Sequence, residues 1–394
     1  MSIAPVSVES DLDPFDEATL LDPLPAWREV RDLGPAAYLR RYDMWFLGRY
    51  DEVKAALRGW ETFSSANGIG LNDAVNEAWS QALINLDPPA HTQQRPLFTE
   101  KLSPHALKPV ADTIQARADD LVAGLLGRGD VDAVTDLAHD LPVNVIMDLI
   151  GWPHDERDRI LEMAAPWFET MGPRNERAER AETRVQEMMA YLHQAVVEER
   201  LAPGGFGASL IEAHKAGAIP IEGAVGLLAG YVVAAFDTTI AAIAAGTWLF
   251  ATHPDEWEIV RAQPDLVPNA VNEVLRLETP IQYFSRVTTR DVDLGEGVLI
   301  PEGSRVIVGY GAANRDERHY PDPDRFDVRR RAGDQLAFSY GRHACAGQGL
   351  AKLETTAVFT AMARQVRRIE LVGEPVLAPT NTTRAFASVP VRLS

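Results

Sequence analysis

The longest apolar run in the chain extends from Ile221 to His253, and it constrains the fold more than any other stretch. Its length alone is typical of a membrane-spanning helix. Against that interpretation, the run has no basic flank to orient it, and Asp237, Thr238 and Thr239 lie in its middle. We therefore expect a buried helix that crosses the centre of a large globule. Polar residues halfway along such a helix are costly unless they are satisfied, and they usually mark a functional point.

The rest of the chain gives no sign of a second unit. It has 394 residues, 46% of them hydrophobic, with no internal repeat, low-complexity tract or Gly/Ser spacer, so we expect a single domain over residues 1–394. Residues 1–11 contain neither a positive region nor an apolar core, which predicts a cytoplasmic protein without signal peptide or membrane anchor. The formal charge of -19 argues against binding to nucleic acid or to an anionic membrane, since both need a basic surface.

The only cysteine, Cys345, lies in the segment Phe338 to Gly347. A lone cysteine forms no internal disulfide or multi-cysteine metal site, so it is a buried small hydrophobe, a nucleophile or a single thiolate ligand to a cofactor iron. Gly341 and Gly347 bracket the sulfur and lack the Cβ that would keep a flat macrocycle at a distance. The helix-forming run that starts at Gln348 places the sulfur at a helix N-terminus, which favours a thiolate.

The spacing of Phe338, Gly341, His343, Cys345 and Gly347 resembles the haem-binding signature of the cytochromes P450. Further motifs of that family follow in the family's order, and the resemblance extends from about residue 12 to the C-terminus. It implies a mainly α fold with a minor β region, a triangular helical prism around a buried haem b. It also implies that Cys345 is the iron ligand and that Phe338, His343 and Gly347 contact the haem.

Three other positions resemble residues that bind the haem carboxylates in this family. His91 and Arg95 lie four apart on a helix that two prolines open, and Arg286 lies in a strand that follows Pro280. Taken alone, His91 and Arg95 would be surface residues. Together with His343, the three positions point to one anionic ligand, because cationic donors form strong hydrogen bonds with carboxylates.

The polar centre of the apolar run, Ala234-Ala235-Phe236-Asp237-Thr238, resembles the family's oxygen-activation motif, with Ala235 in place of the usual glycine. A hydroxyl bonded back to a carbonyl one turn earlier can open the helix and leave room for oxygen and water. The resemblance implies that Asp237 and Thr238, with ordered water, deliver the protons needed to cleave the O–O bond. Phe236 is bulky but need not face the haem.

Glu273, Arg276 and Arg325 resemble the family's Glu-x-x-Arg and Pro-x-Arg-Phe residues. A Glu–Arg pair three apart is a weak signal alone, since such pairs are common on helix surfaces. Here Leu275 indicates a partly buried helix, and Arg325 lies in a Pro-rich loop. The resemblance implies a buried network with a structural role, which locks the loop before the cysteine.

Several stretches resemble the P450 subgroup that hydroxylates or O-demethylates para-substituted benzoates, in which Arg and Ser side chains hold the substrate carboxylate. The matching positions here are Asn67, Gly230 and Val233, so no such clamp is evident. We expect instead a compact, mostly apolar pocket for a small neutral aromatic compound such as an aryl methyl ether. The expected lining is Leu71, Phe168, Met171, Ala234, Ile281, Phe284 and Phe386.

The chain has no flavin or iron–sulfur motif, so the expected electron source is a ferredoxin with an NAD(P)H-dependent reductase. Arg329, Arg330, Arg331, Arg342 and Lys352 on the cysteine side are either a docking surface for it or a solvated run of charges. We expect a monomer that binds O2 and a small molecule. Two alternatives stay open: a terpenoid or fatty-acid substrate, or a peroxide-dependent or sensor haem protein, which the proton-delivery pair argues against.

Overall fold

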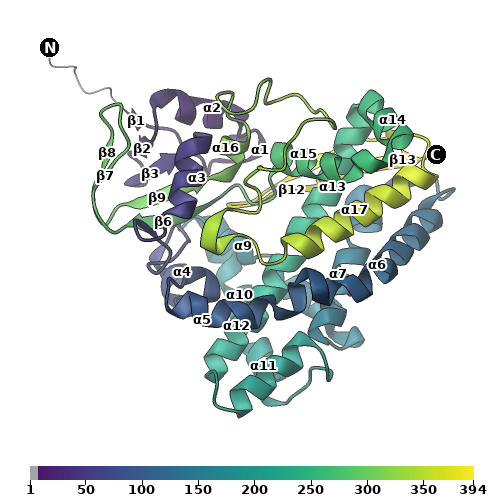
Figure 1. Cartoon of the computed structure of the whole chain (residues 1–394), viewed down its shortest axis with the longest axis horizontal. Coiled ribbons are helices and arrows are strands. Elements are labelled where there is room, and N and C mark those ends of the chain that lie inside the picture. Colours follow the sequence, from purple (N-terminus) through teal and green to yellow (C-terminus); the bar gives the residue numbers. More distant parts are fainter. Residues whose placement is uncertain (1–7) are drawn as a thin grey trace.

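The computed structural model describes residues 8–394, and helices make up most of the fold (Figure 1). Of residues 1–11, in which no leader is expected, 1–7 lie outside the described part. The helices are α1 (Glu17–Leu21), α2 (Leu24–Leu33), α3 (Tyr50–Arg58), α4 (Asp73–Ala78), α5 (Ala90–Thr99), α6 (Pro104–Leu125), α7 (Asp140–Ile150), α8 (Arg157–Ala164), α9 (Trp167–Thr170), α10 (Glu176–Val197), α11 (Phe206–Lys215), α12 (Ile221–Ala235), α13 (Asp237–Thr252), α14 (Pro254–Ala262), α15 (Val267–Glu278), α16 (Tyr310–Asn314) and α17 (Gln348–Gln365).

The strands are short and gather mainly beside the N-terminal helices (Figure 1). They are β1 (Glu9–Ser10), β2 (Ala37–Leu39), β3 (Met44–Leu47), β4 (Phe63–Ser64), β5 (Asp130–Asp132), β6 (Tyr283–Thr288), β7 (Val292–Asp293), β8 (Leu299–Ile300), β9 (Arg305–Gly309), β10 (Ile369–Leu371), β11 (Val376–Pro379), β12 (Arg384–Ser388) and β13 (Pro390–Leu393). The main sheet has the order β1-β2-β3-β9-β6-β4, and smaller sheets join β10-β13-β5, β11-β12 and β7-β8. The expected mainly α fold with a minor β region is confirmed.

The main sheet is held to the N-terminal helices by a small hydrophobic cluster. Trp27 and Val30 of α2 pack there with Phe46 of β3 and Ile307 of β9. These strand residues alternate with neighbours on the other face, as the pleat of a strand requires. The sheet therefore keeps one face for this cluster, and its other face joins the main core.

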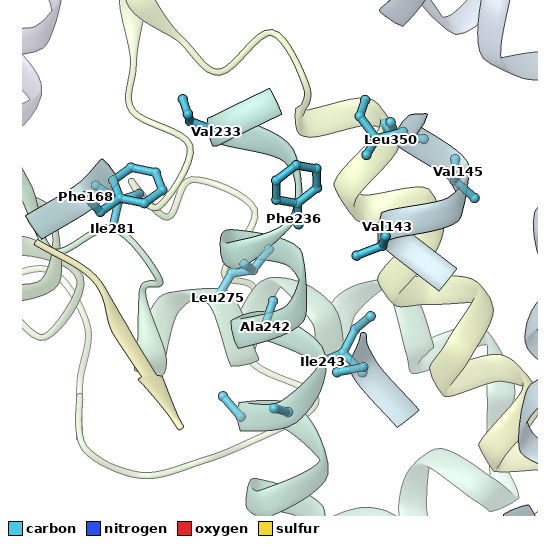
Figure 2. Packing of buried hydrophobic residues seen from close by; sticks show 14 of the residues in the cluster. Val143, Val145, Phe168, Val233, Phe236, Ala242, Ile243, Leu275, Ile281 and Leu350 are labelled. Carbon is cyan, nitrogen blue, oxygen red and sulfur yellow. The ribbon is translucent and has the colours of Figure 1, made fainter. Parts of the chain in front are cut away.

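The apolar run forms two helices, α12 and α13, which meet at Phe236 in the interior (Figures 1 and 2). The stretch Ile221–Thr252 is long and apolar enough to span a membrane, but 67% of its most apolar window is buried inside the protein. Figure 2 shows Phe168 and Ile281 packed on one side of α13, with Val143 and Leu350 on the other. Because neighbours cover it on opposite sides, this run is the central helix of a folded core, as expected.

Helix α15 is fixed to the segment before the cysteine by a buried carboxylate. Glu273 is fully buried and accepts hydrogen bonds from Arg276, 2.7 Å from Nε and 2.9 Å from Nη2. Arg276 Nη1 also donates to the backbone carbonyls of Asn314 and Pro323, at 2.9 and 2.7 Å. A buried ion pair is tolerated only when its remaining donors are satisfied. Those carbonyls therefore tie the chain on the way to the cysteine loop to α15.

The second arginine of this network is Arg330 and not Arg325, so that part of the expectation was wrong. Arg330 Nε donates to Glu273 Oε1 at 3.0 Å, and its Nη atoms donate to two carbonyls of the Pro-rich loop at 2.7 and 3.0 Å. The side chain of Arg325 is exposed, and only its carbonyl takes part, 3.4 Å from Arg276 Nη2. Motif spacing locates a residue in a turn but does not fix the direction in which its side chain points.

We expect Arg330→Met to lower the free energy of unfolding by roughly 1–3 kcal/mol, because Glu273 then loses a charged partner in the interior. Arg325→Met removes a side chain that contacts no acid, and is expected to change stability by less than about 0.5 kcal/mol. Urea denaturation followed by tryptophan fluorescence compares the two variants. Equal losses would contradict the assignment of Arg330.

Candidate active site

The cysteine loop runs from Phe338 to Gly347 and ends at the first turn of α17. The Cys345 N–H donates to the Phe338 carbonyl at 2.8 Å, which closes the loop. Gly341 has a φ of 73°, and a Cβ there would lie 2.7 Å from the Leu57 carbonyl oxygen, so only glycine fits without displacing the backbone. Gly347 has an ordinary φ of -85°, and a Cβ there would lie 3.9 Å from Cys345 Sγ. The missing side chain at Gly347 leaves the sulfur open.

The Cys345 side chain is exposed toward an internal cavity that it lines, so its sulfur is accessible although protein surrounds it. Burial is the largest influence and raises the pKa of the Cys345 thiol. The N–H groups of Gly347 and Gln348 and the Arg95 guanidinium lower that pKa. The helix N-terminus thus favours the thiolate as expected, but it does not outweigh burial. Because a coordinated metal removes the proton from a thiol, a metal ion would stabilise the thiolate here, in agreement with the iron that the family resemblance implies.

The cavity connects the cysteine loop with the middle of the central helices. Helices α12 and α13 contribute one wall, in which small side chains leave space. This wall and the Cys345 sulfur line the same enclosure. The wall residues nearest the break in the helix are Ala234, Ala235, Thr238, Thr239 and Ala242.

Nitrogen-bearing side chains gather beside the sulfur. Arg95, Arg286 and His343 line the cavity, and the His91 ring lies 4.5 Å from the His343 ring. The Nε2 atoms of both histidines are buried without a hydrogen-bond partner among the described residues, and Asp87 lies 4.0 Å from His343 Nε2. Burial, followed by the Arg286 charge, lowers the pKa of His343 to about 2, and burial lowers the pKa of His91. Both rings are therefore neutral near pH 7.

These residues fit a haem. A single sulfur faces a mostly apolar enclosure, and buried cationic or N–H donors lie beside it without enough acids to satisfy them. Such donors are costly unless an anionic ligand satisfies them, and carboxylates form strong hydrogen bonds with them. The structure therefore brings together Cys345, Phe338, Gly347, Arg95, Arg286, His343 and His91 around one site, and the role of each stays a prediction.

The cavity wall contains Thr238 but not Asp237. Thr238 Oγ1 donates to the Ala234 carbonyl at 3.0 Å, and the helix is interrupted at Phe236, as the local opening requires. Phe236 is buried in the core and does not line the cavity. Burial raises the pKa of Asp237 to about 7, and its carboxyl makes no hydrogen bond with the described residues. The hydroxyl thus reaches the cavity, and the acid lies outside its lining, protonated in part near neutral pH.

Most of the expected substrate pocket lines this cavity. The side chains come from α9, from α12 and from β6 with the segment before it, so three distant parts of the sequence meet at one place. Their apolar character agrees with the expected pocket. The residues found in the lining are Phe168, Ala234, Ile281 and Phe284.

Leu71, Met171 and Phe386 do not line the cavity, so these three expectations were wrong. Leu71 belongs to the cluster at the main sheet, and its N–H donates to the Met171 carbonyl at 2.9 Å. Met171 is buried in the main core at 2% exposure. Phe386 on β12 packs against Trp248 of α13, with ring centroids 5.3 Å apart. In each case the segment is near the site, but the side chain points into the core.

Other cavity residues were missed by the sequence analysis. Trp79 and Trp167 pack edge to face, with ring centroids 5.2 Å apart, and Phe98 and Tyr231 lie 4.4 Å apart. Tyr231 lies three residues before Ala234, so helical spacing counted back from the motif would have found it. Trp79 and Phe98 lie in segments whose sequence carries no such signal.

Glu354 on α17 is a further residue that the sequence analysis missed. It lines the cavity, is 2% exposed, and its Oε1 has no hydrogen-bond partner among the described residues. Burial raises the pKa of Glu354 well above its ordinary value. Burial thus favours the neutral form of this carboxyl, because an isolated buried charge costs far more than a buried acid group.

Because the pKa of Asp237 is higher in the folded chain (about 7) than its ordinary 3.8, its contribution favours folding at low pH and is lost as pH rises toward 7. We expect Asp237→Asn to gain roughly 2 kcal/mol of unfolding free energy over the parent chain between pH 5 and pH 8. Urea denaturation at both pH values measures this. Exposed Asp155→Asn is the control and should run parallel to the parent; a parallel Asp237→Asn would contradict the raised pKa.

The sequence comparisons agree with this geometry. Residues 159–368 match the cytochrome P450 family model. The chain is 38% identical to cytochrome P450 CYP199A2 of Rhodopseudomonas palustris, covering 97% of this chain and 94% of that protein. It is 30% identical to 6-deoxyerythronolide B hydroxylase of Saccharopolyspora erythraea, covering 93% and 94%.

Solved structures show the same fold. CalO2 superposes with a TM-score of 0.85 at 26% identity, covering 97% of this chain and 98% of that one. The cytochrome P450 CREJ, solved in complex with (4-ethylphenyl) dihydrogen phosphate, superposes with a TM-score of 0.85 at 28% identity, covering 97% and 99%. With the relatives above and the sulfur at the cavity, these matches show that the chain belongs to the cytochrome P450 family.

Proposed function

We propose that this monooxygenase hydroxylates or O-dealkylates a small, mostly apolar aromatic substrate. Cytochromes P450 carry haem b, which, when bound, activates O2 for insertion of one oxygen atom. The observation that carries the proposal is that Cys345 and Thr238 line one cavity with mostly apolar walls. The residues that would hold the haem are Cys345 as iron ligand, Arg95, Arg286, His91 and His343 toward its carboxylates, and Phe338 and Gly347 beside the macrocycle.

Thr238 and Asp237 are proposed to manage protons. The Thr238 hydroxyl proton is committed to the Ala234 carbonyl, so the oxygen keeps its lone pairs for a water in the cavity. Asp237 has a pKa of about 7 and therefore holds a proton that it can release near neutral pH. The hydroxyl orients the water, and the neighbouring acid is the proton reserve.

The substrate class follows from the charges that the cavity lacks. Arg95 and Arg286 are the only Lys or Arg side chains in the lining of the described chain, and both are assigned to the haem carboxylates. Gly230 and Val233 line the cavity, and a Cβ at Gly230 would lie 3.2 Å from the Phe98 ring. No cation is left for a substrate carboxylate, which supports a neutral aromatic compound. The ligand of CREJ, a 4-ethylphenyl phosphate, supports the aromatic ring of the substrate but not its neutral charge, because a phosphate ester is an anion.

Residues 1–394 are proposed to act as one monomeric domain in the cytoplasm. The main hydrophobic cluster contains residues from Ala36 to Leu393, so both ends of the described chain contribute to one core. The net charge of -19 supports a protein that binds neither nucleic acid nor membrane.

Electrons are proposed to come from a ferredoxin and its NAD(P)H-dependent reductase, docked on the cysteine side. Arg342 is exposed, with its guanidinium 5.2 Å from the Trp60 ring centre, and Lys352 lies 5.4 Å from the Phe338 ring centre. Arg330 is withdrawn from this surface, because it is 14% exposed and bound to Glu273. The remaining candidate surface is Arg329, Arg331, Arg342 and Lys352.

A panel of ligands tests the substrate class. We expect 4-methoxytoluene to shift the haem absorption with a Kd about tenfold lower than 4-methoxybenzoate, because the carboxylate would be buried without a partner. Tighter binding of α-terpineol or lauric acid would move the substrate to the terpenoid or fatty-acid class.

The iron ligand is tested with carbon monoxide. The reduced protein with carbon monoxide must show the absorption of a thiolate-ligated haem, and an imidazole-like band or no pigment would contradict the proposal. Peroxide-driven turnover that survives Thr238→Ala would favour the peroxide-dependent alternative.

Charge reversal tests the docking surface. Arg342→Glu is expected to reduce ferredoxin-supported turnover about tenfold and to flatten its dependence on salt, because surface charges act mainly on association. Arg174→Glu, on a surface-exposed arginine outside this patch, is the control and should change neither. Unchanged turnover and salt dependence in Arg342→Glu would leave the patch a solvated run of charges.

A further inference from the structure

The Arg305 guanidinium, at the start of β9, holds a loop through hydrogen bonds to neutral acceptors. Its Nη1 donates to the carbonyls of Gly68 and Gly70, both at 3.0 Å, and to Ser285 Oγ at 2.9 Å. Its Nη2 donates to the Asn67 carbonyl at 3.0 Å. Among the described residues Arg305 forms no salt bridge, so its positive charge is stabilised mainly by the dipoles of the backbone carbonyls to which it donates. Only a planar fork with five N–H donors can bridge so many acceptors at once.

The loop that Arg305 holds has little freedom. Gly68 has a φ of 84°, and a Cβ there would lie 2.1 Å from Asn76. The Gly70 N–H donates to Asn76 Oδ1 at 2.9 Å, and its carbonyl accepts from Asn76 Nδ2 at 3.1 Å. On the sheet side, the Ser285 N–H donates to the Ile69 carbonyl at 2.8 Å. Every peptide from 68 to 70 is therefore fixed by a hydrogen bond.

The Asn85 side chain also connects this loop to the cavity wall. The Ile69 N–H donates to Asn85 Oδ1 at 3.1 Å, and Asn85 Nδ2 donates to the Trp79 carbonyl at 2.8 Å. Trp79, Leu83 and Ile84 line the cavity, whereas Arg305 does not. Asn85 is 2% exposed, so water cannot readily replace either of its hydrogen bonds. Breaking one of them would leave a buried polar group without a partner, which is unfavourable in free energy.

We propose that Arg305 is a positioning residue, which fixes the cavity wall of Trp79, Leu83 and Ile84 and so sets the size of ring that the site accepts. This inference rests on the cavity being the substrate site proposed above. Arg305 does not line the cavity, so it acts on the site through loop 67–70 and Asn85. A rigid wall selects ligands by shape, because a side chain held in place cannot move aside for a larger ring.

The test uses the haem-loaded full chain and compares Arg305→Met with Arg305→Lys. Amide hydrogen exchange is expected to rise at residues 67–71 and 79–85 in Arg305→Met, and to a smaller extent in Arg305→Lys, which keeps the charge and loses the fork. The ratio of the Kd values for 4-methoxytoluene and 4-methoxybiphenyl is expected to change about tenfold in favour of the larger ligand. Arg290→Met is the matched control, since exposed Arg290 donates only to Thr62 Oγ1, at 2.8 Å.

Parent-like exchange and an unchanged ligand ratio in Arg305→Met would overturn the inference, as would equal changes in Arg290→Met. If Arg305→Met fails to fold, Asn85→Ala replaces it, because it cuts only the link between the loop and Trp79. That variant should raise exchange at 79–85, keep residue 68 protected, and shift the ligand ratio; an unchanged ratio overturns the inference. If neither compound binds the parent chain, the substrate class is wrong, while the exchange data still report on Arg305.

Discussion

The position of the sulfur depends on a carboxylate that never meets it. Glu273 is fully buried and charged groups from two segments converge on it: Arg276 from its own helix and Arg330 from the loop before the cysteine. Arg276 also donates hydrogen bonds to the backbone carbonyls of Asn314 and Pro323. A movement of the loop away from α15 would leave the buried Glu273 carboxylate without its partners. Such a movement is unfavourable in free energy, because an unpaired buried charge is far more costly than a paired one. An ion pair outside the cavity thus helps to fix the position of the loop that carries Cys345.

Charge is separated in and around the cavity. Beside the sulfur there are cationic or N–H groups without enough acids, whereas Glu354 in the lining and Asp237 just outside it are acids without cationic partners. The two sets respond to burial in opposite ways. The guanidinium groups need an anionic ligand, whereas burial raises the pKa of both acids and so favours their protonated forms. The site therefore combines donors for carboxylates with acids, one in the cavity lining and one beside it, that favour the protonated form.

The sequence predicted what depends on spacing and failed on what depends on direction. The local opening of the central helix beside Thr238 and the cysteine before α17 follow from residues at fixed offsets along the chain, whereas the grouping of Arg95, Arg286 and His343 was predicted from the family resemblance. Arg325 and Phe386 lie in a turn and a hairpin, where a small change in backbone angle reverses a side chain. Trp79 was missed because its segment reaches the cavity only through tertiary contacts. Sequence motifs therefore predict which segments lie at the site, whereas side-chain packing determines which side chains line it.

Two arginines, Arg276 and Arg305, serve the two sides of the site by the same chemistry. Each places a guanidinium among backbone carbonyls, one beneath the cysteine loop and the other at the loop that leads to Trp79. They differ in their counter-charge: Arg276 has Glu273, and Arg305 has no acid within salt-bridge distance among the described residues. Carbonyl dipoles compensate less of the desolvation free energy of a guanidinium than a carboxylate does. The contacts of Arg305 are therefore weaker than those of Arg276. Both arginines therefore keep their part of the site in place, and the Arg276 network is the more costly of the two to break.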